Sequence, residues 1–114
     1  MATGNDSQPR RLSGLPTVEA DGRRVRLATT RRARLLGLAL LGRERAGGGL
    51  LIPSCRSVHT FGMRFPIDLA FLDRRGRVVS RRLGVPPRRL VSERRAVAVL
   101  EVPAEGAPRS AAGL

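Results

Sequence analysis

Residues 67–79 read IDLAFLDRRGRVV and indicate the fold of this chain more clearly than any other stretch. The first six residues alternate as a strand does, so that Ile67, Leu69 and Phe71 share one face and the residues between them share the other. The letters DRRG that follow place Asp first and Gly fourth, which favours a type I turn. The letters RVV then return as a second strand, so the stretch predicts a β-hairpin.

Shorter strands are predicted on both sides of this hairpin. Residues 23–27 alternate charged and apolar side chains, as a half-buried strand does. Residues 50–52 form a short apolar strand that ends at Pro53, and residues 96–102 form a final core strand that ends at Pro103. Several short strands separated by turn signals predict a small, mainly β domain, a sandwich or a barrel-like fold.

One short helix is predicted in the N-terminal third, over residues 31–41. Thr29 and Thr30 offer an N-cap before it, and Gly42 stands where a C-terminal cap belongs. Gly37 then lies in the helix interior, where it costs about 1 kcal/mol relative to Ala. The predicted fold class is therefore mainly β with one helix, and α+β is the alternative.

The length of 114 residues predicts a single domain. Residues 1–15 are polar and lack periodicity, which predicts a disordered N-terminal tail. We expect the domain to span residues 16–105 and residues 106–114 to form a C-terminal tail.

The chain carries 22 basic and 9 acidic residues, and every basic residue is arginine. The resulting net charge of +13 favours anionic partners. However, the absence of lysine beside abundant Ala, Gly and Pro is typical of a GC-rich gene, and the Arg-Arg pairs are dispersed along the chain. We interpret most of the charge as codon bias. A nucleic-acid or other polyanion binder, acting through net charge alone, is kept as an alternative function.

The single cysteine, Cys55, excludes an intramolecular disulfide. The N-terminus lacks the apolar segment of a secretory signal. No apolar stretch approaches the roughly 20 residues of a membrane span. We therefore expect a soluble cytoplasmic protein that is a monomer or a weak dimer.

Residues 55–71 contain the only cysteine, the only histidine and all three phenylalanines. If residues 55–63 run as one strand, alternate side chains project to one side and mix polar with apolar groups, as in a small-molecule pocket. The members of this candidate ligand-binding face are Cys55, Ser57, His59, Phe61 and Met63. The alternative is an ordinary strand whose Phe61 and Met63 enter the core.

Asp68 is a further ligand-binding candidate, because it lies within the predicted strand 67–72. A buried carboxylate must be paired or hydrogen-bonded, and Arg64 is the partner that we expect. A structural ion pair is favoured over a catalytic acid, since acid–base hydrolysis of the glycosidase type needs two placed carboxylates.

An anion site is conceivable at the start of the predicted helix. Helix N-termini attract phosphates, and arginine adds bidentate donors. The residues of this weaker candidate are Thr30, Arg31, Arg32 and Arg34. A solvated basic face is the favoured alternative there.

No catalytic residue, metal or cofactor is predicted. Cys55 and His59 are four residues apart, about 13 Å along a strand, which is too far for a nucleophile and its base. Together they supply two metal ligands, fewer than zinc requires. A metal- or redox-dependent site at these two residues is kept as a second alternative.

Several motifs resemble those of a known family. They are Gly37-Leu38 with Arg43, Gly48-Gly49-Leu50-Leu51, Met63 with Pro66-Ile67-Asp68-Leu69-Ala70-Phe71-Leu72-Asp73 and Gly76-Arg77-Val78-Val79, and Val99-Leu100-Glu101-Val102-Pro103. On these motifs, residues 17–105 resemble the domain of unknown function 192 (DUF 192) family. The resemblance implies a compact, mainly β domain of bacteria and archaea with no established activity, so no site residue is carried over from it.

The chain departs from the family's commoner pattern just before Pro66. Where that pattern has Trp-Met-Lys-Asn-Thr, this chain has His59-Thr60-Phe61-Gly62-Met63. A pocket built by that Trp, Lys and Asn would therefore differ here. Taken together, the sequence predicts a non-enzymatic accessory module that binds a small ligand or a protein through residues 55–63.

Overall fold

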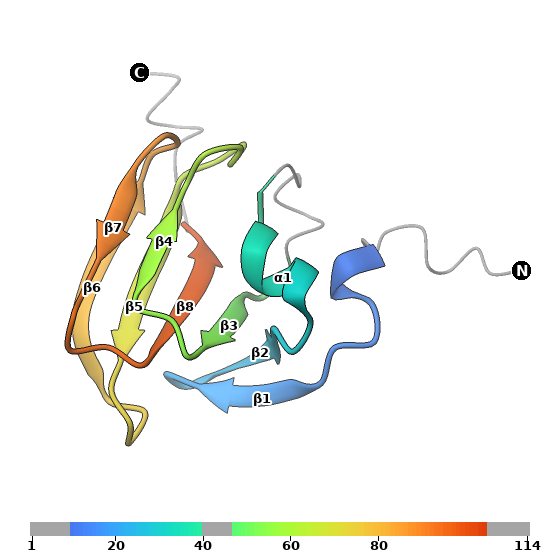
Figure 1. Ribbon diagram of the computed structural model, residues 1–114, viewed down its shortest axis with the longest axis horizontal. Coiled ribbons are helices and arrows are strands. Elements are labelled where there is room, and N and C mark those ends of the chain that lie inside the picture. The colour runs from blue at the N-terminus through green and yellow to red at the C-terminus, as the bar shows by residue number, and fades with distance from the viewer. Residues whose placement is uncertain (1–9, 40–46, 105–114) are drawn as a thin grey trace, which may run out of the picture.

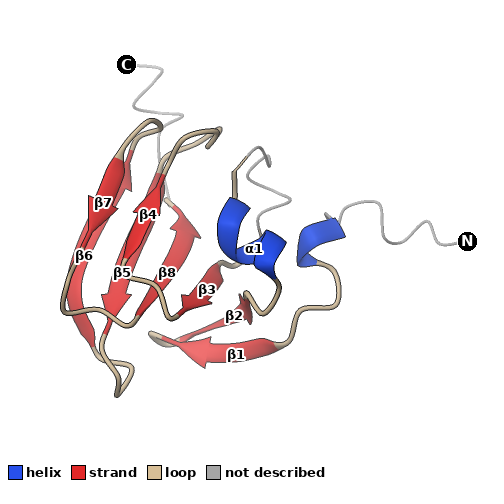
Figure 2. Ribbon diagram, viewed as in Figure 1, coloured by secondary structure: helices blue, strands red, loops and turns tan. Residues whose placement is uncertain are grey.

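The computed structural model describes residues 10–39 and 47–104, and the fold is mainly β, as predicted (Figures 1 and 2). Strands dominate these residues, with one α-helix and one short 3-10 helix. In chain order the elements are η2 (Arg10–Leu12), β1 (Thr17–Ala20), β2 (Arg23–Leu27), α1 (Arg31–Leu36), β3 (Leu50–Pro53), β4 (Ser57–His59), β5 (Ile67–Leu72), β6 (Val78–Val85), β7 (Leu90–Ser92) and β8 (Ala98–Pro103).

The predicted hairpin is confirmed as β5 and β6, which pair antiparallel. Its turn closes with a hydrogen bond of 2.9 Å from the Gly76 N–H to the Asp73 carbonyl. The Asp73 carboxylate also accepts from the N–H groups of Arg75 and Arg77, at 2.8 and 2.9 Å. The backbone N–H of Arg77, with a smaller contribution from that of Arg75, lowers the pKa of Asp73. The carboxylate therefore supports the turn from inside, as an Asp at the first turn position does.

The strands form two sheets of unequal size. The large sheet has the order β1-β2-β3-β8-β5-β6, and the small sheet pairs β4 with β7. All neighbouring strands are antiparallel except β2 and β3. Among the described strands, β1 and β6 are the edges of the large sheet, which is therefore not closed into a barrel. The small sheet and α1 lie over one face of it, which gives a sandwich-like arrangement (Figure 1).

Side chains on both faces of the central strands β5 and β8 are largely buried. Ile67, Leu69 and Phe71 enter the main core with Val58 of the small sheet and Ala33 of α1. Ala70 and Leu72, which alternate with these residues, lie on the opposite face. A second cluster there consists of Ala20, Val25, Ala70, Leu72, Leu100 and Val102.

The β1–β2 hairpin bends toward the far edge of the large sheet. Asp21, in the turn between β1 and β2, accepts two hydrogen bonds from the guanidinium of Arg81 on β6, at 2.8 and 2.9 Å. These hydrogen bonds lower the pKa of Asp21 and raise that of Arg81. The pair links the two edge regions of the sheet across 60 residues of sequence.

The helix is shorter than predicted. Thr30 is its N-cap, because the Thr30 hydroxyl accepts a hydrogen bond of 3.0 Å from the Ala33 N–H. The helix ends at Leu36, so the prediction of residues 31–41 is wrong for residues 37–39, and residues 40 and 41 lie outside the described residues. Gly37 is the C-cap with φ 53°, a left-handed conformation that glycine tolerates and other residues resist. The predicted cap Gly42 lies outside the described residues.

Part of the predicted N-terminal tail belongs to the folded domain. Arg10–Leu12 form a 3-10 turn, and the Leu12 side chain is only 1% exposed within the main core. The predicted tail 1–15 is therefore folded from residue 10, and residues 1–9 and 105–114 lie outside the described part. At the C-terminal side, β8 begins at Ala98 rather than at residue 96.

Candidate functional site

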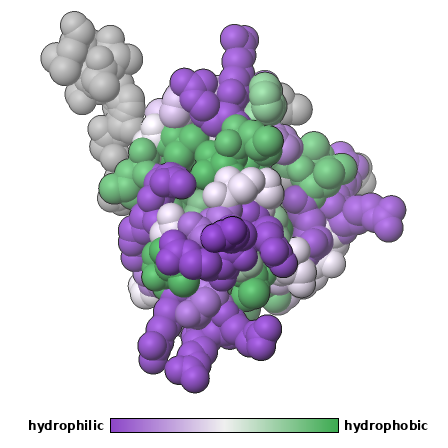
Figure 3. Space-filling view, turned by 60° about the vertical axis from the view of Figure 1, so that its left-hand side comes forward, coloured by the Kyte–Doolittle hydropathy of each residue, from purple (hydrophilic) through white to green (hydrophobic). Residues whose placement is uncertain are grey.

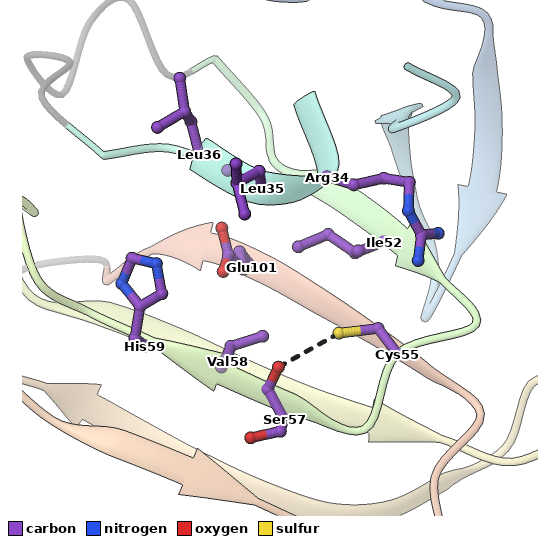
Figure 4. Close-up of a pocket in the computed structure, with 10 residues that line it drawn as sticks. Arg34, Leu35, Leu36, Ile52, Cys55, Ser57, Val58, His59 and Glu101 are labelled. Carbon is purple, nitrogen blue, oxygen red and sulfur yellow. Dashed lines mark hydrogen bonds between the residues drawn. The ribbon is translucent and has the colours of Figure 1, made fainter. Parts of the chain in front are cut away.

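A pocket of about 140 Å³ opens between α1 and the sheets (Figure 4). Its roof is the second half of α1 with Gly37, and its walls are Ile52 of β3 and the segment 55–59. Glu101 of β8 forms its floor and supplies the one acidic side chain that lines it. The pocket therefore collects side chains from four separate elements.

Glu101 reaches this pocket because of its position in the sheet. β8 lies between β3 and β5, and Glu101 pairs with Leu50 on one side and Leu69 on the other. Side chains alternate along β8, so Glu101 shares a face with Val99, which belongs to the main core. The side chain is only 2% exposed. A carboxyl group thus stands where the fold otherwise places aliphatic side chains.

Burial dominates the electrostatics of Glu101. It raises the pKa of the carboxyl group from 4.5 to about 7, because a charged form is poorly solvated there. The backbone N–H of Leu38 donates to the carboxylate, and the guanidinium of Arg11 attracts it, which both lower the pKa by smaller amounts. Near neutral pH the group therefore exists in both its protonated and its ionised form.

Gly37 makes room for this carboxyl group. A Cβ atom on Gly37 would lie 2.6 Å from Oε1 of Glu101, closer than real Cβ contacts. The backbone conformation at Gly37 also requires glycine, since φ is positive. The glycine of the Gly37-Leu38 motif is thus explained by the approach of the helix end to Glu101.

The Arg11 side chain binds the backbone just after α1, next to the pocket. Its Nε donates to the Gly37 carbonyl at 3.1 Å, and its Nη2 donates to the Ala39 carbonyl. The N-terminal 3-10 turn therefore fixes the segment after α1, whose Leu38 N–H meets Glu101. The positive charge of Arg11 is offset by two carbonyl groups and acts on Glu101 through space.

His59 is the second polar group that faces the pocket without a partner. Its Nδ1 and the Oε1 of Glu101 are buried side-chain atoms for which no hydrogen bond is found among the described residues. The His59 ring packs against the ring of Phe61, with centroids 6.0 Å apart and planes tilted by 43°. Figure 4 shows the His59 ring and the Glu101 carboxyl group lining the same space.

The comparison with known sequences decides the family. The sequence model of domain of unknown function 192, described as uncharacterized ACR, matches residues 16–111. The chain belongs to the DUF 192 family. The resemblance found in the sequence motifs is thereby confirmed, and the family has no characterised function. No curated protein matches the chain significantly.

Two solved structures share the fold of this DUF 192 chain. One is a protein of unknown function from Novosphingobium aromaticivorans, with 22% identity, a TM-score of 0.56, and coverage of 78% of this chain and 71% of that one. The other is described as a putative transcription regulator from Sinorhizobium meliloti, with 21% identity, a TM-score of 0.57, and coverage of 77% of each chain. At these identities the similarity concerns the fold alone.

The predicted ligand-binding face is only partly assembled in this DUF 192 domain. Cys55, Ser57 and His59 do line the pocket. Residues 55–63 are nevertheless not one strand, because β4 ends at His59 and the chain turns at Phe61. Phe61 is 55% exposed and does not line the pocket, and Met63 is buried in the main core. The alternative interpretation is thus correct for Met63 and wrong for Phe61.

Asp68 lies apart from this pocket. It alternates with Leu69, so its side chain is on the other face of β5, where it lines a separate small hollow with Asp21 and Arg81. Its carboxylate accepts a hydrogen bond of 2.8 Å from the Gly84 N–H. The expected ion pair with Arg64 is not among the ion pairs of the described residues. Cys55, His59 and Asp68 therefore do not share one cavity.

The hydrogen bond of the Cys55 thiol is with the backbone and not with His59. The Cys55 thiol donates to the Ser57 carbonyl at 3.3 Å, and Figure 4 shows this hydrogen bond with Cys55 and His59 at opposite ends of the pocket. Within residues 10–39 and 47–104, no group of three or more His, Cys, Asp or Glu side chains converges on a point that could hold a metal ion. A metal- or redox-dependent site at these residues stays a prediction.

The anion site suggested at the helix start is only partly available. The Thr30 hydroxyl is occupied as the N-cap, and the Arg34 guanidinium donates to the carbonyls of Pro53 and Ser54. Arg34 thus fastens α1 to the end of β3. Arg31 and Arg32 are exposed and stay candidates.

In the described part of the chain, no helix is long and apolar enough to cross a membrane.

Glu101 is the functional candidate that sequence reasoning missed. The signal was present, because a single carboxylate interrupts the apolar residues 96–102 of the predicted core strand. A charged residue in a strand buried on both faces points to a site or to a paired charge.

Proposed function

We propose that this DUF 192 protein is a non-enzymatic binding module that holds a small molecule in the pocket beneath α1. The observation that carries the proposal is a pair of buried side-chain atoms, Oε1 of Glu101 and Nδ1 of His59, that find no hydrogen-bond partner among the described residues and belong to two residues lining the pocket. Buried polar atoms in folded proteins are nearly always hydrogen-bonded, and each exception asks for a partner. A ligand in the pocket supplies that partner.

The size and the lining of the pocket restrict the ligand. About 140 Å³ is smaller than the roughly 300 Å³ at which pockets for drug-sized ligands begin, so the ligand has few non-hydrogen atoms. Leu35, Ile52 and Val58 provide apolar contact, while Glu101 and His59 provide hydrogen bonding. A small molecule with an N–H or O–H donor on a short apolar group fits this lining.

Binding is favoured over catalysis by the state of the nucleophiles. The Cys55 thiol donates to a backbone carbonyl, and the Ser57 hydroxyl is hydrogen-bonded to the Ser92 hydroxyl at 2.8 Å. A hydrolase of the acyl-transfer type needs a nucleophile held by a base, and neither group is so held by His59 or Glu101. The carboxyl group, with a pKa of about 7, can instead donate or accept a hydrogen bond toward a bound molecule.

The proposal is tested by titrating the 15N-labelled protein with acetamide, ethylammonium chloride and 1,2-propanediol. We expect at least one of them to shift the backbone amide resonances of Leu38, Val58 and His59, which surround the pocket. Glu101→Leu is expected to abolish these shifts, and Asp68→Leu, on the opposite face, to retain them. Failure of all three compounds to shift these resonances, or equal shifts in Glu101→Leu, would overturn the proposal.

A further inference from the structure

A second hollow lies at the end of the molecule where β4 and β6 finish. The turn after β4 and the loop from β6 to β7 lie side by side at the upper end of Figure 1. Between them is a broad depression of about 630 Å³, lined by Gly62, Met63, Arg64 and residues 86–89. Figure 3 shows hydrophilic side chains projecting at this end of the molecule beside a hydrophobic band.

Thr60 connects the two loops that form this depression. It is fully buried, its hydroxyl donates to the Pro86 carbonyl at 2.7 Å, and the same oxygen accepts from the Arg89 N–H at 2.8 Å. The Thr60 backbone adds hydrogen bonds with the Arg89 carbonyl and with the N–H groups of Met63 and Arg88. One buried residue therefore fixes both loops relative to each other.

The arginines on these loops lack acidic partners. The ion pairs in the described part of the chain are Arg24 with Glu19, Arg81 with Asp21, and Arg95 with Glu93. Arg64, Arg88 and Arg89 are exposed and take part in none of them. Three guanidinium groups thus surround one hollow with no carboxylate in its lining.

An exposed aromatic ring lies in the turn that also contributes Gly62 and Met63 to the lining of this hollow. Phe61 precedes Gly62 in the turn and is 55% exposed, whereas the other two phenylalanines are buried. Its ring leans on that of His59, which restricts its orientation. Clustered guanidinium groups together with an accessible aromatic ring are the combination that binds single-stranded nucleic acids, by phosphate contact and by base stacking.

We infer that this surface, formed by Phe61, Arg64, Arg88 and Arg89, binds single-stranded nucleic acid. The guanidinium groups contact phosphates, which their planar donor pairs match, and Phe61 stacks on a base. An acidic peptide would satisfy the arginines but has no counterpart for the stacking ring. The inference concerns a different surface from the pocket of Glu101 and holds or fails independently of it.

The inference is tested by fluorescence anisotropy of fluorescein-labelled dT12 with the full chain, between 50 and 200 mM NaCl. The triple variant Arg64→Gln/Arg88→Asn/Arg89→Gln is expected to weaken binding at least tenfold more than a matched variant. That control, Arg74→Gln/Arg75→Gln/Arg77→Gln, removes the same charge from the β5–β6 turn. The first variant should also reduce the slope of log K against log salt by about 2, since each phosphate contact contributes about 0.7.

Stacking is tested separately with Phe61→Ala. Loss of one stacked base is expected to weaken dT12 binding at least about fivefold without changing the salt slope. Leu90→Ala, which removes another exposed apolar side chain (71% exposed), is the control and should bind dT12 as the unaltered chain does. Circular-dichroism melting confirms that each variant is folded.

Three outcomes would overturn the inference. Equal losses in the two triple variants would mean that net charge alone attracts the DNA. Unchanged affinity in Phe61→Ala would remove the stacking site. Binding of a labelled twelve-residue polyglutamate as tight as that of dT12 would show that the surface recognises acidic chains in general.

Discussion

At the scale of single residues, Glu101 is the unusual feature of the molecule. Natural cores rarely bury a carboxyl group without a paired charge. Here the group faces a pocket, receives one backbone N–H from Leu38, and keeps one oxygen unsatisfied. Evolution toward stability alone would place an aliphatic residue in a central strand, so the carboxyl group points to a function.

Glu101 is expected to make the protein less stable as the pH rises from 4.5 to 7. The folded state keeps the proton up to a pKa of about 7, whereas the unfolded state releases it near 4.5. Folding is therefore favoured by protonation, and its contribution is complete below pH 4.5 and lost above pH 7. At 1.36 kcal/mol per pH unit, the free energy of unfolding should fall by about 3 kcal/mol.

Urea unfolding followed by circular dichroism at pH 5, 6, 7 and 8 measures the slope of the free energy of unfolding against pH. Glu101→Gln, which does not ionise, is expected to flatten it. Glu93 has a pKa lowered to about 2 by Arg95, so Glu93→Gln is a control that should leave the slope in this range unchanged. An equal slope in Glu101→Gln and the unaltered chain would contradict the assignment.

Gly37 is expected to tolerate no side chain. Gly37→Ala brings a Cβ within 2.6 Å of the Glu101 carboxyl group and places alanine at φ 53°, so we expect a loss of about 3 kcal/mol in stability. Gly76→Ala is the matched control, because φ is also positive there but no atom lies within 4 Å of the added Cβ. It should cost about 1 kcal/mol.

Urea unfolding of both glycine variants tests this difference. In the double variant Gly37→Ala/Glu101→Ala the clash is removed, and the loss should be smaller than the sum of the single losses. Equal costs at Gly37 and Gly76 would mean that the backbone conformation, and not the contact with Glu101, accounts for the glycine.

At the scale of elements, the end of β4 shapes both candidate sites. The strand stops at His59 because the Thr60 backbone and hydroxyl bond to the loop of residues 86–89. The chain then turns at Phe61 and Gly62 before β5 begins. This early end leaves His59 lining the pocket and leaves Phe61 exposed in the turn whose next residues, Gly62 and Met63, line the arginine-lined depression.

Thr60→Val is expected to destabilise the protein by about 2 kcal/mol. Valine has nearly the same shape but loses the hydroxyl, which leaves the Pro86 carbonyl and the Arg89 N–H without their side-chain partner. Thr60→Ser keeps the hydroxyl and should cost less. Urea unfolding gives the free energies, and hydrogen exchange of the Arg89 amide should be accelerated in Thr60→Val alone. Unchanged exchange would contradict the role of the hydroxyl.

At the scale of the whole molecule, the bend of the large sheet creates its second core. The β1–β2 hairpin covers the face opposite the pocket, where Val25 meets Leu72 and Leu100. The Asp21–Arg81 pair joins the hairpin to β6 at the surface. Apolar burial therefore provides most of the energy that packs the hairpin on the sheet, and the ion pair contributes to the geometry of the bend.

The Asp21–Arg81 pair is expected to contribute little stability. Its side chains are 25% and 50% exposed, respectively, and exposed ion pairs contribute about 0.5 kcal/mol. A double-mutant cycle with Asp21→Asn and Arg81→Gln, measured by urea unfolding, should give a coupling energy near this value that decreases in 1 M NaCl. A coupling above about 2 kcal/mol would show that the pair holds the bend in place.

The strands were predictable because their signals are local. Alternation in residues 67–72 and 23–27 and the Asp-Arg-Arg-Gly turn depend on a few neighbouring residues, and β5, β2 and the turn follow them closely. The helix length was not predictable in the same way. In the sequence, leucines continue at helical spacing past Leu36. In the structure the helix ends there, and Gly37 has a positive φ and lies against the carboxyl group of Glu101 from β8.

The pocket depends on contacts between distant parts of the chain. Three of its residues, Cys55, Ser57 and His59, stood out from their residue types, yet Glu101 joins them only because β8 inserts between β3 and β5. Phe61 left the predicted face because β4 ended at His59, and Asp68 lines a different hollow because side chains alternate along β5. Local signals therefore predicted β2, β3, β5, β8 and the turn after β5, and sequence motifs indicated the family, whereas β1 and β7 were not predicted. The site required the strand order, since only that order sets which side chains meet.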